Sequence, residues 1–360
     1  MKCDITVIIC TFNRCQILTT ALDKVIASQL PASLSWEVLV VDNNSNDQTR
    51  EVVEKFGVRY PGRVRYLFES QPGKSHALNA GIREARGDIL AFMDDDVSVE
   101  LTWLHNLTAP LVSGECACVG GRTLLAERFS PPAWLALSGP YGLGGVLAAM
   151  FDLGDEPCEL NDPPYGANMA VPKKMFQKYG TFRADLGPSP NKDIPRPNED
   201  TEFGRRLMSA GERLRYEPSA VALHPVPKDR VRQDYFLRWW FDYGRAAIRE
   251  LPRRADIWGI PRRYFTISKI VLTVFTRRAL RWFFSMTPQR RFFRKCFVWM
   301  TVGQVLEIHR LWRAQTTEPP NTGWQIGCQD VASCTPKRDD GSQNLNCNPS
   351  EQSLHRCATR

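Results

Sequence analysis

Short apolar runs alternate with longer stretches of helical period from residue 1 to about residue 225. Four apolar runs, each rich in Val, Ile, Leu or Phe, predict strands at Asp4–Cys10, Trp36–Val41, Val64–Phe68 and Asp88–Met93. Helical patterns lie between them at Gln16–Ser28, Asp47–Phe56 and Lys74–Ala85, and Gly57 is expected to end the second helix. This order predicts βαβ units, and therefore an α/β fold with a mostly parallel central sheet.

The remainder of the chain has a different character. Residues 126–198 are rich in Pro and Gly and are predicted to be loop-like, forming an acceptor cleft or a lid. Residues 226–315 are aromatic and basic and predict a helical C-terminal region. Residues 316–360 are polar and without period, and they predict a disordered tail. We therefore expect one α/β domain over residues 1–225, followed by these two segments.

Composition and charge narrow the class of protein. The 360 residues are 43% hydrophobic and 24% charged, which excludes a wholly disordered or fibrous chain. A net charge of +8 suggests an anionic partner, such as a nucleotide or an anionic membrane surface. No known nucleic-acid-binding motif is present, so nucleic acid is not an expected partner.

Cysteine usage and the terminal sequence indicate a cytoplasmic protein. The chain has 11 cysteines and no C-x-x-C, which argues against a zinc cluster or a disulfide framework and favours reduced thiols. The apolar run at the N-terminus is too short for a signal peptide. No uncharged apolar stretch of about 18 residues is present, so we expect no spanning helix.

Polar residues follow each predicted strand. In open α/β sheets, ligands bind beyond the carboxyl ends of the strands, so these residues should line one edge. They supply an acceptor for a nucleobase at Asp42, cations at Arg14 and Lys74, and a carboxylate triplet at 94–96. Three consecutive carboxylates repel one another, and a divalent cation such as Mg²⁺ or Mn²⁺ relieves this repulsion.

The ordered set of motifs resembles the inverting family 2 glycosyltransferases, which have the GT-A fold. The matching segments are TVIICTFNR at 6–14, WEVLVVDNNSNDQT at 36–49, GKSHALNAGIREARGDILAFMDDD at 73–96, YGANMAV at 165–171 and NEDTEFGRRL at 198–207. The resemblance covers residues 4–225, which would then be the catalytic domain. It implies a hexosyltransferase-type enzyme that uses a divalent cation (Mn²⁺ or Mg²⁺) and a nucleotide-sugar donor of the UDP-sugar class.

The resemblance also implies roles for individual residues. The nucleotide-sugar pocket falls on Thr11, Arg14, Asp42, Gly73, Lys74, Asn79, Asp94 and Asp95. The metal ligands fall on Asp94 and Asp96 of the D-x-D pattern, with His224 as a further ligand. The catalytic pair is Glu199 and Asp200, with Asp200 as the base that takes the proton from the acceptor hydroxyl.

Three alternatives stay open on the sequence. The first alternative is a nucleotidyltransferase, which usually has a glycine-rich loop bearing arginine and lysine directly after the first strand. Here that position is TFNRC, without glycine, which disfavours this class of enzyme. A non-catalytic protein of the same fold could bind nucleotide-sugars or membranes. Residues 264–284 place Phe265, Phe275, Trp282 and Phe283 on one half of a helix and Lys269, Arg277 and Arg281 on the other. Such a basic amphipathic helix suits either packing on the catalytic core or binding at the inner face of a membrane.

The expected acceptor is a glycan or a lipid-linked precursor of a cell-surface polysaccharide.

Overall fold

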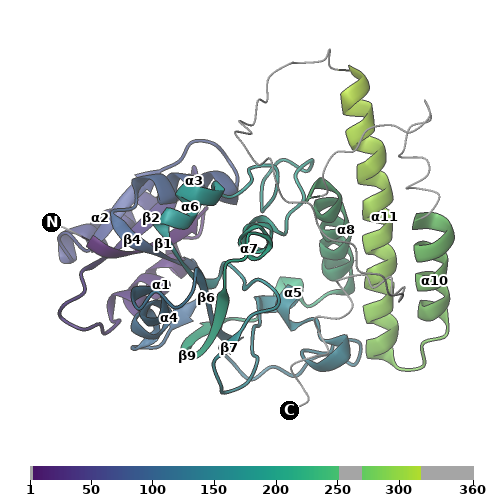
Figure 1. The fold of residues 1–360 in the computed structure, drawn as a ribbon, viewed down its shortest axis with the longest axis horizontal. Helices are drawn as coiled ribbons and strands as arrows, with labels where there is room; N and C mark the ends of the chain where they lie inside the picture. Colours follow the sequence, from purple (N-terminus) through teal and green to yellow (C-terminus); the bar gives the residue numbers. More distant parts are fainter. Residues whose placement is uncertain (1–2, 251–269, 318–360) are drawn as a thin grey trace, which may run out of the picture.

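A nine-stranded sheet forms the centre of the first part of the chain (Figure 1). The computed structural model describes residues 3–250 and 270–317. The strand order is β3-β2-β1-β4-β8-β6-β9-β5, with β7 paired to β9. The strands are β1 (Cys3–Thr11), β2 (Trp36–Asp42), β3 (Val64–Phe68), β4 (Gly87–Asp94), β5 (Ser98–Val99), β6 (Cys118–Leu125), β7 (Cys158–Glu159), β8 (Asn168–Pro172) and β9 (Leu214–His224).

The four predicted strands form the parallel half of this sheet. Their bounds lie within one residue of the predicted ones, because continuous apolar runs bounded by polar residues define them. In the register, Thr11 lies opposite Asp42, and Cys10 lies opposite Asp94. The polar residues at the ends of β1, β2 and β4 therefore meet at one edge, and the predicted α/β fold is confirmed.

The other half of the sheet is mixed, and part of it lies where loops were predicted. Strand β8 falls inside the Pro- and Gly-rich segment, yet it pairs antiparallel with both β4 and β6. All five of its residues are buried. The run is short and is bordered by Pro and Gly, which hid it in the sequence, so the expectation of loop throughout 126–198 was wrong at this strand.

Helices cover both faces of the sheet. The flanking helices are α1 (Cys15–Ile26), α2 (Thr49–Arg59), α3 (Lys74–Glu84), α4 (Trp103–Val112), α6 (Lys173–Tyr179) and α7 (Glu199–Ser209). One apolar cluster joins Ile5, Val7 and Ile9 of β1 to α1, α2 and α4, and another joins Ile8 to α3, α6 and α7. Gly57 lies within α2 rather than ending it, so that predicted helix end was wrong.

The C-terminal region is helical, as expected. Helix α5 (Gly144–Ala148) and the 3-10 turns Gly139–Tyr141 and Lys228–Arg230 precede α8 (Gln233–Glu250). A π-helix (Ile270–Phe275), α10 (Thr276–Phe283) and α11 (Pro288–Thr317) complete the described chain. Helices α8 and α11 approach closely, because Gly244 lies against the backbone of Met300 and Gly303 lies against the backbone of Phe241. In Figure 1, α7 lies between the sheet and α8, and α11 and α10 lie beyond α8.

The predicted amphipathic helix at 264–284 is described only from residue 270 onwards. Within α10, Arg278 is buried and donates a hydrogen bond to Thr301 of α11, whereas Leu280 and Phe283 are exposed. Of the predicted apolar half, Phe283 is thus exposed, whereas Phe275 and Trp282 are half-buried. None of the helices in the described residues has both the length and the apolar character needed to cross a bilayer. The predicted tail lies almost wholly outside the described residues.

Candidate active site

The end of β1 contacts the carboxylate triplet that follows β4. The hydroxyl of Thr11 donates a hydrogen bond of 2.7 Å to Asp95. The Arg14 guanidinium lies 2.6 Å from Asp95 and 3.1 Å from Asp96. Burial raises the pKa of the Asp95 carboxyl although Arg14 opposes this. These contacts place the loop after β1 directly against the carboxylate triplet at 94–96, as the neighbouring positions of β1 and β4 require.

Asp42, at the end of β2, is buried and held in a fixed orientation. One carboxylate oxygen accepts from the backbone N–H of Ser45 at 2.9 Å, and the other accepts from the Tyr66 hydroxyl at 2.8 Å. Burial and the carboxylate of Asp42 raise the pKa of the Tyr66 hydroxyl, so Tyr66 remains a donor. Tyr66 was not among the predicted site residues, since it lies in the middle of β3 and only the strand pairing brings it to Asp42.

Lys74 joins the carboxylate triplet to the acidic pair at the start of α7. Its ammonium lies 2.6 Å from Asp94 and 3.9 Å from Glu199. Burial disfavours the charge of Lys74, but the neighbouring carboxylates raise its pKa above its ordinary value. Burial likewise disfavours the charge of Asp94, and Lys74 nevertheless holds the pKa of Asp94 below its ordinary value. The predicted donor side and the predicted base side are therefore in contact.

Asp94, Asp96 and His224 form a group suited to a metal ion. One potential ligand atom from each lies within 4.8 Å of the other two. The Oδ1 atom of Asp96 is buried and has no hydrogen-bond partner within residues 3–250 and 270–317, and it lies 3.6 Å from Nε2 of His224. The Nδ1 atom of His224 lies 2.7 Å from the carbonyl oxygen of Pro225, which can only accept. In the tautomer that donates its Nδ1–H to this carbonyl, Nε2 faces Asp96 with its lone pair, and these atoms then fit a divalent cation.

Asp200 and Glu199 begin helix α7, where the helix dipole favours negative charge. The carboxylate of Asp200 accepts hydrogen bonds of 2.6 Å from the backbone N–H groups of Gly166 and Thr201. A side chain at position 166 would crowd Asp200, so the glycine leaves room beside it. Burial and the charge of Asp200 raise the pKa of Glu199 to about 8. One small cavity is lined by Lys74, Asp94, Glu199 and Asp200 together.

Two of the predicted residues have a different local role. Asn79 is bonded through both amide atoms to the backbone of Phe182, at 2.8 and 3.0 Å, so it fixes the chain beyond α6. Gly73 donates its N–H to the side chain of Asn43 at 2.7 Å, which shapes the turn before Lys74. A nucleotide contact by either residue stays a prediction.

A larger cavity lies elsewhere and carries none of these groups. It is lined by Asp4 and Asp88, which stand at the amino ends of β1 and β4, and by Glu115, Glu212 and Arg213. Because ligands of open α/β sheets bind at the carboxyl ends of the strands, we place the active site at the smaller cavity.

The chain is similar in sequence and in fold to glycosyltransferases of the GT-A type. Residues 6–156 match the model of Glycosyl transferase family 2. "Glycosyltransferase AglE" of Haloferax volcanii is 28% identical over 222 residues, which are 62% of this chain and 67% of that protein. "Succinoglycan biosynthesis protein ExoM" of Rhizobium meliloti is 25% identical over 248 residues, which are 69% of this chain and 75% of that protein.

A solved structure agrees on the fold. The mannosyltransferase PcManGT of Pyrobaculum calidifontis, described in complex with GDP-Man and Mn²⁺, has a TM-score of 0.56 at 18% identity and covers 85% of this chain and 88% of its own. The match to the family 2 model over residues 6–156 and the glycosyltransferases among its relatives identify the chain as a glycosyltransferase.

Proposed function

We propose that this enzyme is a metal-dependent inverting glycosyltransferase that moves a sugar from a nucleotide-sugar, of the UDP-sugar class, to a glycan or lipid-linked acceptor in cell-surface polysaccharide synthesis. One observation carries the proposal: the possible metal ligand Asp94 and the acidic pair Glu199 and Asp200 line one cavity, joined by Lys74. Displacing a nucleoside diphosphate from a sugar needs a cationic group at the leaving diphosphate and a base at the acceptor, held close together.

The donor side is assigned to the ends of β1, β2 and β4. Asp42, fixed by Ser45 and Tyr66, retains lone pairs that can accept an imide N–H of uracil. Arg14 and Lys74 neutralise the carboxylate triplet in the protein alone, and both are placed to turn towards phosphate oxygens. Asp94, Asp96 and His224 would hold Mn²⁺ or Mg²⁺, which supplies charge neutralisation for the leaving diphosphate.

The acceptor side is assigned to α7. Glu199, with a pKa of about 8, is mostly protonated at neutral pH and cannot then take a proton. This favours Asp200 as the base for the acceptor hydroxyl. Two backbone N–H groups hold its carboxylate in place, so its orientation is set before the acceptor binds. A base opposite the leaving group gives direct displacement and inversion at the anomeric carbon.

We further propose that the turn between α10 and α11 contacts an anionic membrane. Four apolar side chains are exposed there, namely Leu280 (54%), Phe283 (72%), Phe284 (69%) and Met286 (90%). Arg277 and Arg291 lie near them in the sequence and are also exposed. Aromatic residues bordered by arginines suit the headgroup region, where each basic residue contributes about 1 kcal/mol. This surface shares Phe283 and Arg277 with the helix at 264–284 that the sequence indicated.

Vesicle sedimentation tests the membrane proposal. Phe283→Ser with Phe284→Ser should abolish binding to anionic vesicles, and Arg277→Glu with Arg281→Glu should make the residual binding insensitive to salt. Equal, negligible binding of the unaltered protein to anionic and neutral vesicles would contradict it.

A donor screen tests the proposed chemistry. Thermal stability should rise with one member of a panel of nucleotide-sugars, and the rise should require Mn²⁺ or Mg²⁺. The alternative, a non-catalytic protein of the same fold, predicts the same rise without release of a nucleoside diphosphate when candidate acceptors are added. The intact Asp94, Asp96 and Asp200 favour the enzyme.

A further inference from the structure

The segment between Phe182 and α7, residues 183–198, lies against the candidate active site. Its Leu186 carbonyl accepts a 2.6 Å hydrogen bond from the hydroxyl of Ser75, and its Pro188 carbonyl accepts one of 2.8 Å from the N–H of Lys74. Gly187 has a φ of +95°, and a side chain there would meet Ser75 and Glu199. The position of this segment therefore sets the space beside Lys74 and Glu199.

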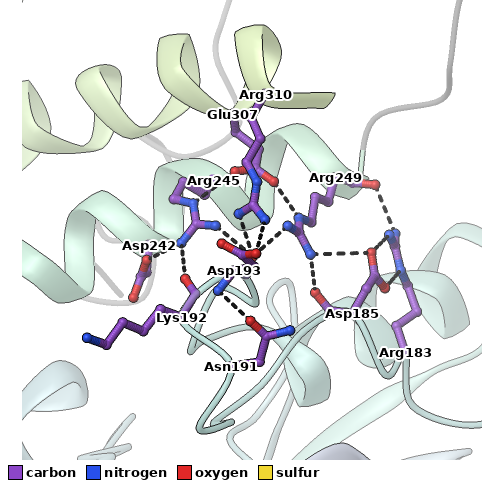
Figure 2. Close-up of polar contacts among 10 residues, drawn as sticks. All are labelled: Arg183, Asp185, Asn191, Lys192, Asp193, Asp242, Arg245, Arg249, Glu307 and Arg310. Carbon is purple, nitrogen blue, oxygen red and sulfur yellow. Dashed lines mark hydrogen bonds and ion pairs between the residues drawn. The ribbon is translucent and has the colours of Figure 1, made fainter. Parts of the chain in front are cut away.

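The same segment is held from its other side by arginines of the helical region (Figure 2). Arg249 donates 2.8 Å and 2.7 Å hydrogen bonds to the carbonyl oxygens of Asp185 and Asp193. Arg245 donates to the carbonyl oxygens of Lys192 and Asp193 at 3.3 and 2.7 Å. Arg310 of α11 also donates to the Asp193 carbonyl, at 2.9 Å. Both ends of the 185–193 stretch are thus tied to α8 and α11.

Glu307 of α11 orients the two arginines of α8. Its carboxylate accepts from Nε of Arg245 at 2.8 Å and from Nε of Arg249 at 2.6 Å. The Glu307 side chain is 1% exposed, and those of Arg245 and Arg249 are 9% and 10% exposed. With each Nε fixed on Glu307, the terminal nitrogens of both guanidinium groups point towards the segment, as Figure 2 shows. A buried charge of this kind is costly unless it is paired. Without the charge of Glu307, Arg249 loses its carboxylate partner at 2.6 Å, whereas Arg245 keeps only Asp242 at 2.9 Å.

A second contact joins α8 to the start of α7, the helix that begins with Glu199 and Asp200. Glu250, the last residue of α8, accepts 2.9 Å from the side chain of Asn198 and 2.7 Å from Arg205. Asn198 immediately precedes Glu199 and has a φ of +86°, in the left-handed region. The helical region therefore holds the segment and the entry to α7 at once.

We propose that Glu307 is a positioning residue for transfer: through Arg245 and Arg249 it fixes residues 183–198 over Lys74 and Glu199, and thereby sets the geometry of Asp200 towards the acceptor. This deepens the proposed function and rests on it. The helical region is, in this account, a part of the active-site support and not an independent module.

Three variants of the full chain separate positioning from stability. Glu307→Gln keeps the shape of the side chain and removes its charge. Arg249→Met removes the hydrogen bonds to Asp185 and Asp193 and leaves the pair of Arg245 with Glu307 in place, so it serves if Glu307→Gln does not fold. Thr301→Val is the matched control, because Thr301 accepts a buried hydrogen bond from Arg278 of α10, a contact between α10 and α11 that does not reach the segment.

Hydrogen exchange and kinetics give the decisive readings. In Glu307→Gln and Arg249→Met, amides of residues 183–198 should exchange at least about tenfold faster, and kcat should fall at least about tenfold with the donor KM within about threefold. Thr301→Val should lower the melting temperature without either change. Equal exchange and kcat in all three variants at matched loss of stability would overturn the proposal. If the unaltered enzyme turns over no nucleotide-sugar, the proposed function fails. Unchanged exchange in Glu307→Gln and Arg249→Met would instead overturn the proposal that Glu307 positions residues 183–198.

Discussion

The carboxylate of Asp96 lies 3.6 Å from Nε2 of His224, although the two residues lie at the ends of different strands of the sheet. Asp96 lies just after β4, and His224 is the last residue of β9, which pairs with β6. Among the described residues, none forms a hydrogen bond with the buried Oδ1 of Asp96. A buried carboxylate oxygen this close to an imidazole nitrogen is an arrangement that a divalent cation completes.

The first prediction concerns these ligands. Asp96→Asn should weaken Mn²⁺-dependent binding of UDP at least about tenfold, because it removes an anionic ligand from the group. The fold should survive, since the change relieves repulsion within the carboxylate triplet. His224→Ala should raise the Mn²⁺ concentration needed for half-maximal binding, measured by calorimetry. An unaltered Mn²⁺ titration in both variants would exclude these residues as ligands.

The second prediction concerns the base. Asp200→Asn retains the shape of the side chain and loses the proton acceptor, so turnover should fall about 10²–10⁴-fold. Binding of the donor should stay near that of the unaltered enzyme, because the base faces the acceptor. Single-turnover kinetics and donor titration give the two quantities separately. A crippled Glu199→Gln beside a nearly normal Asp200→Asn would mean that the two roles are reversed.

The third prediction concerns pH and Glu199. Its pKa is about 8 in the folded protein against an ordinary value of 4.5, so folding favours the protonated form. The unfolded chain loses this proton above about pH 4.5, so the contribution of Glu199 to stability falls as pH rises from about 4.5 to 8 and is constant above that. Glu199→Gln removes this dependence. Its melting temperature, relative to that of the unaltered protein, should therefore increase between pH 5 and pH 8. Parallel melting curves for the two proteins across this range would contradict the assignment.

The fourth prediction concerns the contact between α8 and α11. Gly303→Ala places a methyl group against the backbone of Phe241, and such overpacking costs about 1–3 kcal/mol. The melting temperature should fall despite the better helix propensity of alanine. Gly57→Ala is the control, because in α2 the added methyl meets only ordinary contact and should not destabilise. A Gly303→Ala protein as stable as the control would show that the two helices do not pack this closely.

The sequence was sufficient where local pattern decides the structure. The run from Val64 to Phe68 was placed without error, and the parallel order of β1, β2 and β4 brought Thr11, Asp42 and Asp94 together as expected. Hydrophobic periodicity did not predict the structure where contacts between segments distant in the sequence determine it. Strand β8 is short and bordered by Pro and Gly, and the burial of Arg278 depends on its contact with Thr301.

The contact of Glu307 with Arg245 and Arg249 also lay beyond sequence analysis. The three residues look like ordinary charges of a basic helical region, and no spacing relates the end of α8 to α11. Only the close approach of the two helices, at Gly244 and Gly303, brings the carboxylate between the arginines. Predictions from a single sequence therefore reached the donor edge of the site and missed its support.

The central claim is that this site transfers a sugar with a bound divalent cation and a carboxylate base. It is tested most directly by measuring nucleoside diphosphate release, with the donor found by the screen and a glycan acceptor, in Mn²⁺ and in EDTA. The account predicts release in Mn²⁺, loss of release in EDTA, recovery when Mn²⁺ is restored, and no recovery in Asp96→Asn. Equal release in Mn²⁺ and EDTA, or full Mn²⁺-stimulated release by Asp96→Asn, would contradict it.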